Sequence, residues 1–304
     1  MKLKHLFISI LAVVLVFPLM GAFAQQAPGS LTIQVVTTFD YPGTGNSTIP
    51  EGINDRGDIT GLYTDASGIT RGFLRFHSGS FSPPIVEPND PGVYTAGRGI
   101  NHARGVDGYY QGSDGAFHGF FLDQGTYTEF NVPGAITTFV EGLNDNGDFV
   151  GADDSTGILL AFRNVGGTTT TIDIADASSS YAFGINRQRT CTGQYTSAST
   201  GVIHGYYADA AGTVTTFDPP NATQTLPFGL NNKTFIVGRY TDSTTGLETG
   251  FMFNSRKGTY VSYQYPAAVF TSFNGMTTDG LICGRYDDGS GLLHGLLVRV
   301  VPGQ

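Results

Sequence analysis

Two glutamates and one arginine of this 304-residue chain have side chains and positions that would suit acid–base catalysis. Glu51 and Glu141 each stand directly before a glycine that begins the same short sequence pattern, and Arg98 stands before a third such glycine. Paired carboxylates with a guanidinium to position the substrate suit a glycan hydrolase or lyase. A separation of roughly 5 to 10 Å between the carboxylates keeps that chemistry open, and a much wider gap closes it.

Three histidines form a second candidate set, because imidazoles from three segments can ligate zinc. His118, His204 and His294 each precede a glycine at corresponding positions of a repeat, so a closed ring would place them far from one another. Metal ligation needs bonds of about 2 Å to one centre. We therefore predict structural hydrogen bonding for these histidines and no metal site. The chain has no nucleophile elbow, Walker loop or dinucleotide fingerprint, so no cofactor is predicted.

These residues belong to a repeat of about 45 residues, which is the strongest pattern in the chain. The segment GINDRGDITGLY at Gly52 recurs with first glycines at Gly99, Gly142, Gly184, Gly229 and Gly275. A second glycine follows nine positions later in every copy, at Gly61, Gly108, Gly151, Gly193, Gly238 and Gly284. Such a constant spacing indicates positions where the backbone bends or approaches a neighbour too closely for a side chain.

Two further anchors complete the unit. A segment such as HisGlyPhe at His118 follows the second glycine, and an apolar residue three places before a proline closes most copies, as Phe130 does before Pro133. Between the anchors run short alternating stretches rich in Thr, Val, Tyr and Phe, separated by turn residues. Each unit therefore predicts four strands. The spacings between first glycines, 47, 43, 42, 45 and 46 residues, are typical of a propeller blade.

The two ends of the chain indicate a closed ring. The last copy stops after its third strand, and the segment LTIQVVTTFDYPG from Leu31 matches the fourth strand of another copy. We therefore predict an all-β, six-bladed β-propeller with four antiparallel strands per blade, in which the N-terminal strand completes the last blade. The predicted domain spans residues 25–304, with blade repeats starting near residues 43, 89, 134, 176, 221 and 267.

Residues 1–24 have the pattern of a secretory signal peptide. Lys2 and Lys4 precede an apolar run that is short of the roughly 20 residues needed to span a membrane, and Ala22 and Ala24 give the cleavage pattern. We expect a secreted or extracellular protein, with the periplasm as the other possible compartment. Cys191 and Cys283 lie at non-equivalent positions of separated repeats, so we predict two free, mostly buried thiols.

Through its GlyIleAsn segments at Gly52, Gly99 and Gly184, the chain resembles the extracellular HAF-repeat family of bacterial exported proteins. That family combines a GINDxGxxxG segment with a HisAlaPhe strand, for which this chain has HisGlyPhe. The resemblance covers essentially the whole mature chain. It implies an extracellular repeat protein and carries no established reaction or catalytic residue.

The position before each first glycine is the predicted binding site. It lies on the inner strand nearest the channel, and its residue type varies where its neighbours repeat. Charged and amide groups facing two phenylalanines would suit a small polar ligand with one apolar face. The alternative is a channel that holds water and a Glu–Arg pair. The six ligand-binding candidates are Glu51, Arg98, Glu141, Phe183, Phe228 and Asn274.

Two function classes follow. The first is an exported, non-catalytic repeat propeller that binds a surface glycan, a small molecule or a protein, and the absence of a catalytic motif favours it. The second is a glycan hydrolase or lyase that uses Glu51 and Glu141 in the central channel. With 16 basic against 25 acidic residues, the chain lacks the basic footprint that nucleic acid requires. We expect a monomer without a membrane span.

Overall fold

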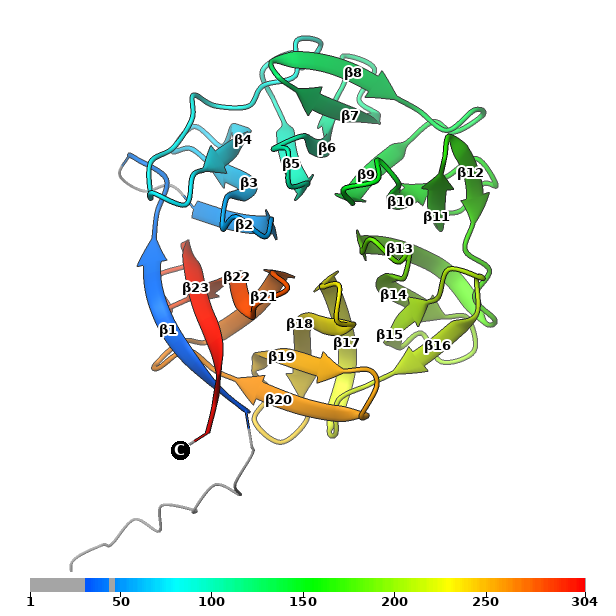
Figure 1. Cartoon of the computed structure of the whole chain (residues 1–304). Helices are drawn as coiled ribbons and strands as arrows, with labels where there is room; N and C mark the ends of the chain where they lie inside the picture. Colours follow the sequence, from blue (N-terminus) through cyan, green and yellow to red (C-terminus); the bar gives the residue numbers. More distant parts are fainter. Residues whose placement is uncertain (1–30, 44–46, 304) are drawn as a thin grey trace, which may run out of the picture.

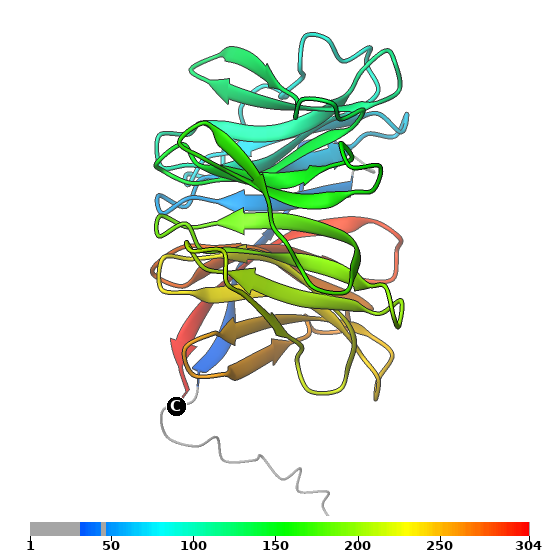
Figure 2. The same cartoon turned by 90° about the vertical axis from the view of Figure 1, so that its right-hand side faces the viewer.

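The computed structural model describes residues 31–43 and 47–303, and within these ranges it contains strands, turns and bends but no helix. The sheets are arranged radially around a central channel (Figure 1). From the side, the strands run between the two faces of a thick disk (Figure 2). The alternating, Thr- and aromatic-rich segments of the sequence therefore form strands, as their period predicts.

Three sheets have four antiparallel strands each, connected in chain order. Short turns join the strands, and some need a positive φ, as at Gly115 (φ 82°) between the second and third strands of one sheet. The first sheet contains β5 (Thr95–Ile100), β6 (Val106–Gln111), β7 (Phe117–Asp123) and β8 (Thr126–Phe130). The second contains β9 (Thr138–Leu143), β10 (Phe149–Asp153), β11 (Leu160–Val165) and β12 (Thr168–Thr171). The third contains β13 (Ala177–Ile185), β14 (Cys191–Ser197), β15 (Ile203–Ala208) and β16 (Val214–Phe217).

A fourth sheet has three strands, namely β2 (Ser47–Ile53), β3 (Ile59–Thr64) and β4 (Thr70–Arg75). Where the repeat predicts an outer strand, Phe81 and Ile85 make only isolated bridges to β4. Pro83 and Pro84 lie between these bridges and have no backbone N–H to donate. A continuous fourth strand is therefore interrupted.

The remaining strands form one eight-stranded sheet. This sheet consists of two sets of four strands, and a parallel pairing of Glu248 with Phe270 joins the first set to the second. In the second set, β1 pairs antiparallel with the last strand, from Leu31 opposite Pro302 to Phe39 opposite Gly295. The sets are β17 (Ala222–Leu230), β18 (Phe235–Asp242), β19 (Glu248–Asn254) and β20 (Thr259–Tyr263), then β21 (Phe270–Met276), β22 (Leu281–Asp287), β23 (Leu293–Pro302) and β1 (Leu31–Phe39).

The predicted six-bladed propeller with four strands per blade is therefore wrong. The described residues form four separate blades, one of which has three strands, and one larger sheet. Two local departures from the repeat cause the difference: the prolines after β4, and the link between Glu248 and Phe270. The pairing predicted between the N-terminal segment and the last strand is present.

The repeated glycines serve close approach of the backbone, as predicted. A Cβ at Gly151 would lie 1.8 Å from the carbonyl oxygen of Phe139 on the adjoining strand. A Cβ at Gly142 would lie 2.4 Å from the carbonyl oxygen of Phe183 on the inner strand of the next sheet. The second glycine of each unit thus lets two strands of one sheet bend together, and the first lets neighbouring inner strands meet around the channel.

The third anchor of the repeat supplies the core between sheets. Its apolar residue is completely buried in every copy, as Phe73, Phe120, Phe162, Tyr206, Phe251 and Leu296. Cys191 and Cys283 are also buried and are free thiols, as predicted. The predicted signal peptide lies outside the described residues. No helix long and apolar enough to cross a membrane is found within residues 31–43 and 47–303.

Candidate functional site

The predicted site residues occupy β-bulges of the inner strands. In five inner strands the pairing with the second strand skips the residue before the first glycine, and in β13 and β17 it also skips the second residue of the strand. In β5 the skipped residues are Arg98 and Gly99. A bulge residue has no ladder partner, and the local bend re-aims its side chain. This exemption from strand pairing explains why the residue type can vary in an otherwise repeated segment.

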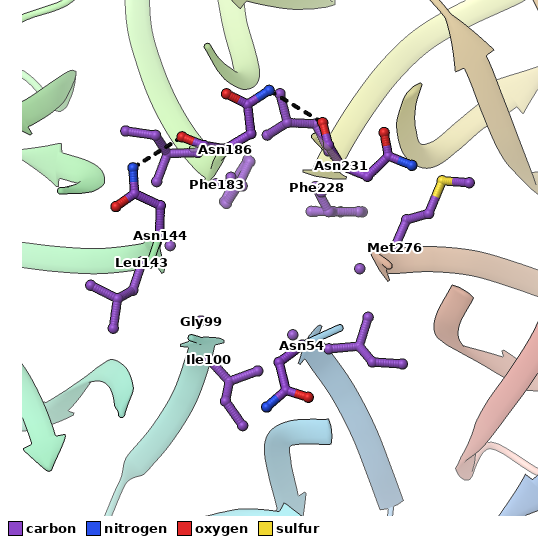
Figure 3. Close-up of a pocket in the computed structure, with 18 of the residues that line it drawn as sticks. Asn54, Gly99, Ile100, Leu143, Asn144, Phe183, Asn186, Phe228, Asn231 and Met276 are labelled. Carbon is purple, nitrogen blue, oxygen red and sulfur yellow. Dashed lines mark hydrogen bonds between the residues drawn. The ribbon is translucent and has the colours of Figure 1, made fainter. Parts of the chain in front are cut away.

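All six predicted residues line one cavity in the central channel. The cavity has a volume of about 120 Å³, whereas one water needs roughly 10–15 Å³. It also contacts the turns at one end of the inner strands, through residues such as Asn54 and Asn144. Figure 3 looks into this pocket and shows Phe183 beside Phe228, across the opening from Gly99 and Ile100. The structure therefore brings the candidate residues together.

A network of ion pairs forms one side of the pocket. Arg98 Nη1 lies 2.8 Å from Glu51 Oε1, and Arg98 Nε donates to Glu141 Oε2. Arg285 Nη1 donates to Glu51 Oε1 at 2.9 Å, and Asn274 Nδ2 donates to Glu51 Oε2 at 2.7 Å. One guanidinium thus bridges both carboxylates, so the two groups lie close enough together for the glycosidase alternative to stay open.

The environment separates the pKa values of the two glutamates. Burial alone would raise the pKa of Glu51, but Arg98, Arg285 and the hydrogen bond from Asn274 outweigh burial and hold the pKa below its usual range. For Glu141, burial raises the pKa to about 7, and the charge of Glu51 adds to this shift, although Arg98 opposes it. Glu51 is therefore ionised at neutral pH, whereas Glu141 gains or loses its proton close to neutral pH.

Sequence reasoning missed Arg285, which follows the second glycine of its repeat. The equivalent residues are Leu62, Tyr109, Ala152, Gln194 and Arg239, so this position varies like the bulge position. Burial lowers the pKa of Arg285, and Arg239 and Arg98 contribute to the shift, although Glu51 opposes it. The variation within the repeat is the signal that could have identified Arg285.

Asp107 is a second missed residue, directly behind the pocket wall. Its Oδ1 accepts a hydrogen bond from the backbone N–H of Gly99, and the side chain is completely buried. Burial raises the pKa of Asp107 to about 7. Other repeats have an uncharged residue at this position, as at Thr60, Val150, Thr192, Val237 and Cys283. A single acid among uncharged equivalents is the signal that could have identified it.

Phe183 and Phe228 form the apolar side of the pocket. Their ring centroids are 5.3 Å apart in an edge-to-face arrangement. Arg98 Cζ lies 6.0 Å from the Phe183 centroid, and Arg239 Cζ lies 5.2 Å from the Phe228 centroid. Each phenylalanine ring therefore has an arginine guanidinium beside it, and this cation–π attraction helps to hold the two rings in place.

The repeated asparagines organise the mouth of the pocket. Asn144 Oδ1 accepts from the backbone N–H groups of Asn146 and Asp148, as an Asx turn requires. Its Nδ2 donates to the carbonyl of Asn186 at 3.0 Å, and Asn186 donates to the carbonyl of Asn231 at 3.2 Å (Figure 3). The asparagines therefore hold their own turns, as predicted, and also join neighbouring inner strands.

The three histidines lie on the third strands, outside the residues that line the pocket. His204 Nδ1 lies 2.7 Å from Asp218, and His294 Nδ1 lies 3.0 Å from Asp40. His118 Nδ1 lies 3.2 Å from Asn131 Oδ1. The predicted structural hydrogen bonding is confirmed, and it joins each third strand to the residues that follow the outer strand.

No family model matches the chain. No curated protein sequence matches it either. Among solved structures, a putative TolB from Agrobacterium tumefaciens is 11% identical with a TM-score of 0.57, covering 91% of this chain and 99% of that chain. A catalytically inactive virginiamycin B lyase from Staphylococcus aureus with quinupristin is 12% identical with a TM-score of 0.51, covering 90% and 100%.

The SapL1 lectin in complex with alpha methyl fucoside is also similar to this chain. It is 10% identical with a TM-score of 0.53, covering 85% of this chain and 95% of the lectin. These neighbours are β-propeller proteins, and they include both binding proteins and a lyase. At such low identities the likeness shows the fold alone, so the chain has a β-propeller fold.

Proposed function

We propose that the chain is an exported, non-catalytic binding protein, of the HAF-repeat type, that takes a small polar ligand in its central pocket. One observation carries the proposal: six bulge residues, each free of strand pairing, converge on a single cavity. The polar side of the cavity would bind polar groups of the ligand, and Phe183 with Phe228 would cover an apolar face. The ligand is a small molecule or the end of a surface glycan or a protein.

The arrangement of charges favours binding over hydrolysis. Arg98 stands between the two glutamates, and both oxygens of Glu51 already accept hydrogen bonds or ion pairs. A retaining or inverting glycosidase needs open space between its carboxylates for the scissile bond. Here the Arg98 guanidinium occupies that position and pairs with both carboxylates, which suits recognition of a ligand at the pocket surface.

A second candidate function is a glycan hydrolase or lyase, and the opposite pKa shifts of the two glutamates favour it. An ionised Glu51 beside a Glu141 whose pKa is about 7 resembles the division between a base and an acid in carboxylate catalysis. A lyase among the structural neighbours shows that this fold accommodates catalysis. In this function, displacement of Arg98 by the substrate would open the space between the carboxylates.

The mature protein, residues 25–304, tests both candidates in one experiment. Screening against glycan and small-metabolite libraries by ligand-observed NMR, with the same samples assayed for turnover, identifies a ligand or a product. Glu51→Ala and Glu141→Ala should each weaken binding at least tenfold, because each removes a partner of Arg98. Unchanged binding in both variants removes the pocket from consideration, and turnover that both variants abolish would favour the enzyme.

The proposed compartment has its own test. Expression of the full chain in a bacterial host should yield a processed protein outside the cytoplasm, with a mature N-terminus near Gln25. Mass spectrometry of the secreted and periplasmic fractions measures the cleavage position. Light scattering of the same material should give the mass of a monomer. An unprocessed cytoplasmic product would contradict the export proposal.

A further inference from the structure

Arg98 and Glu141 are joined by a single hydrogen bond, although a guanidinium and a carboxylate can form two. A guanidinium can bind a carboxylate through Nε and Nη2 together, with one N–H donated to each oxygen. In this structure only Arg98 Nε donates, and Glu141 Oε2 accepts. Arg98 Nη2 and Glu141 Oε1 have no hydrogen-bond partner among residues 31–43 and 47–303. The pocket therefore presents one donor beside one acceptor.

Glu51 and Asn274, the neighbouring polar groups of this side, already have partners. Glu51 Oε1 contacts Arg98 and Arg285, and Glu51 Oε2 accepts from Asn274. Asn274 Oδ1 accepts from Ser272 at 2.8 Å. A ligand thus finds an open donor and an open acceptor at the Arg98–Glu141 pair, whereas both oxygens of Glu51 and the oxygen of Asn274 already have at least one partner.

Burial increases the selectivity of this pair. The side chain of Arg98 is 11% exposed and that of Glu141 is 4% exposed. A ligand that covers these groups without hydrogen bonding to them leaves buried polar atoms unpaired, which costs affinity. Phe183 lies beside Arg98 and Phe228 beside Phe183, so an apolar surface adjoins the pair.

We infer that the pocket recognises a saccharide end group, with two adjacent hydroxyls on Arg98 and Glu141 and the apolar ring face on Phe183 and Phe228. One hydroxyl accepts a hydrogen bond from Arg98 Nη2, and its neighbour donates to Glu141 Oε1. The inference rests on the proposed binding function and names the ligand class.

Competing ligand classes match the pair less well. A carboxylate would satisfy Arg98 Nη2 and would be repelled by Glu141 in its ionised form. An ammonium group would satisfy Glu141 and would be repelled by Arg98. A vicinal diol supplies an acceptor and a donor at neighbouring atoms without a net charge. Its ring also has a face of C–H groups that can pack on phenylalanine.

The test titrates the mature protein with the methyl glycosides of glucose, galactose, mannose and fucose by calorimetry. A second set contains amino acids and small carboxylates, which lack adjacent hydroxyls. We expect at least one glycoside to bind. Two monodeoxy derivatives, each lacking one hydroxyl of the recognised pair, should bind at least tenfold more weakly, whereas removal of a hydroxyl outside the pair should have little effect.

Arg98→Lys is the matched variant, because lysine keeps the positive charge between Glu51 and Glu141 and lacks the second planar donor. It should weaken glycoside binding at least tenfold. Arg189→Lys is the control, since Arg189 pairs with Asp148 outside the residues that line the pocket. The deoxy series uses the unaltered protein, so the test stands even where Arg98→Lys does not fold.

The outcomes separate the two proposals. Glycoside binding that depends on Arg98 and on both adjacent hydroxyls supports the saccharide inference. Binding of an amino acid or carboxylate that depends on Arg98, without glycoside binding, overturns the inference and leaves the binding function standing. Glycoside binding that neither Arg98→Lys nor the loss of any hydroxyl weakens also overturns the inference. Absence of binding by every probe counts against both proposals.

Discussion

Asp107 shows how a single buried carboxyl makes stability depend on pH. Its Oδ1 accepts from Gly99, whereas Oδ2 is buried without a hydrogen-bond partner in the described part of the chain. Burial raises its pKa from 3.8 to about 7. Between these values the folded protein keeps a proton that the unfolded chain has lost, so the stability contributed by this group falls as pH rises.

Asp107→Asn should therefore become more stable relative to wild type as pH rises from 5 to 8. Asparagine mimics the protonated acid and does not titrate, so the variant does not lose stability as wild type does between pH 3.8 and about 7. Its stability relative to wild type should be higher at pH 8 than at pH 5 by about 3 kcal/mol, because about two pH units separate pH 5 from the folded pKa, at about 1.4 kcal/mol per unit. Urea unfolding of both proteins at the two pH values measures the difference. An equal difference at pH 5 and pH 8 would contradict the raised pKa.

At the scale of the strand, the turn asparagines connect elements that the sheet hydrogen bonds leave separate. Asn186 Oδ1 accepts from the backbone N–H of Thr190, and Nδ2 donates across to the carbonyl of Asn231. Asn101 holds its own turn in the same way, through the N–H of Gly105, and within the described ranges its side chain donates no hydrogen bond to the next inner strand. The two asparagines therefore differ mainly in the bond between sheets.

Asn186→Ala should destabilise the fold more than Asn101→Ala. Both variants lose one bond within the turn, and only Asn186→Ala also removes a bond between sheets, to the carbonyl of Asn231, which keeps its bond from the backbone N–H of Thr234. We expect an additional loss of about 1 kcal/mol in the free energy of unfolding. Urea denaturation with a common slope measures both losses. Equal losses would show that the bond between sheets contributes nothing.

At the scale of the whole molecule, the ends of the chain hold the ring closed. β1 pairs with β23 over most of its length, and Thr278 donates its backbone N–H to Asp55 Oδ1 at 2.7 Å, from residues 223 apart in sequence. Arg285 and Glu51, which lines the pocket, make a similar long-range contact. The sheet that contains β1 and β23 and the sheet that begins with β2 therefore meet both at the closure of the ring and beside the pocket.

Removal of residues 31–39 should open this closure. The ten residues of β23 would become an unpaired edge, and apolar edge strands of that length associate with other chains. We expect the shortened protein to form oligomers or aggregates and to unfold at lower urea concentration. Size-exclusion chromatography with light scattering measures its mass. A monomer with the wild-type unfolding midpoint would contradict a structural role for β1.

The sequence by itself determined the repeated backbone rules. Gly142 and Gly151 recur because a side chain would collide with a neighbouring carbonyl, and this constraint is the same in each copy. The residues that line the pocket beside these glycines could also be predicted, because residues such as Glu51 and Phe183 vary within a constant segment. That variation reflects their place in bulges, where the ladder makes no demand on residue type.

Only the tertiary structure decided how the sheets join and which groups meet. The link between Glu248 and Phe270 depends on the gap between two neighbouring sheets, which no repeat pattern encodes. The pairing of Arg285 with Glu51 joins residues 234 apart, so it exists only because the ring closes. The raised pKa of Glu141 likewise depends on burial and on the number of arginines that reach it, and both are properties of the folded ring.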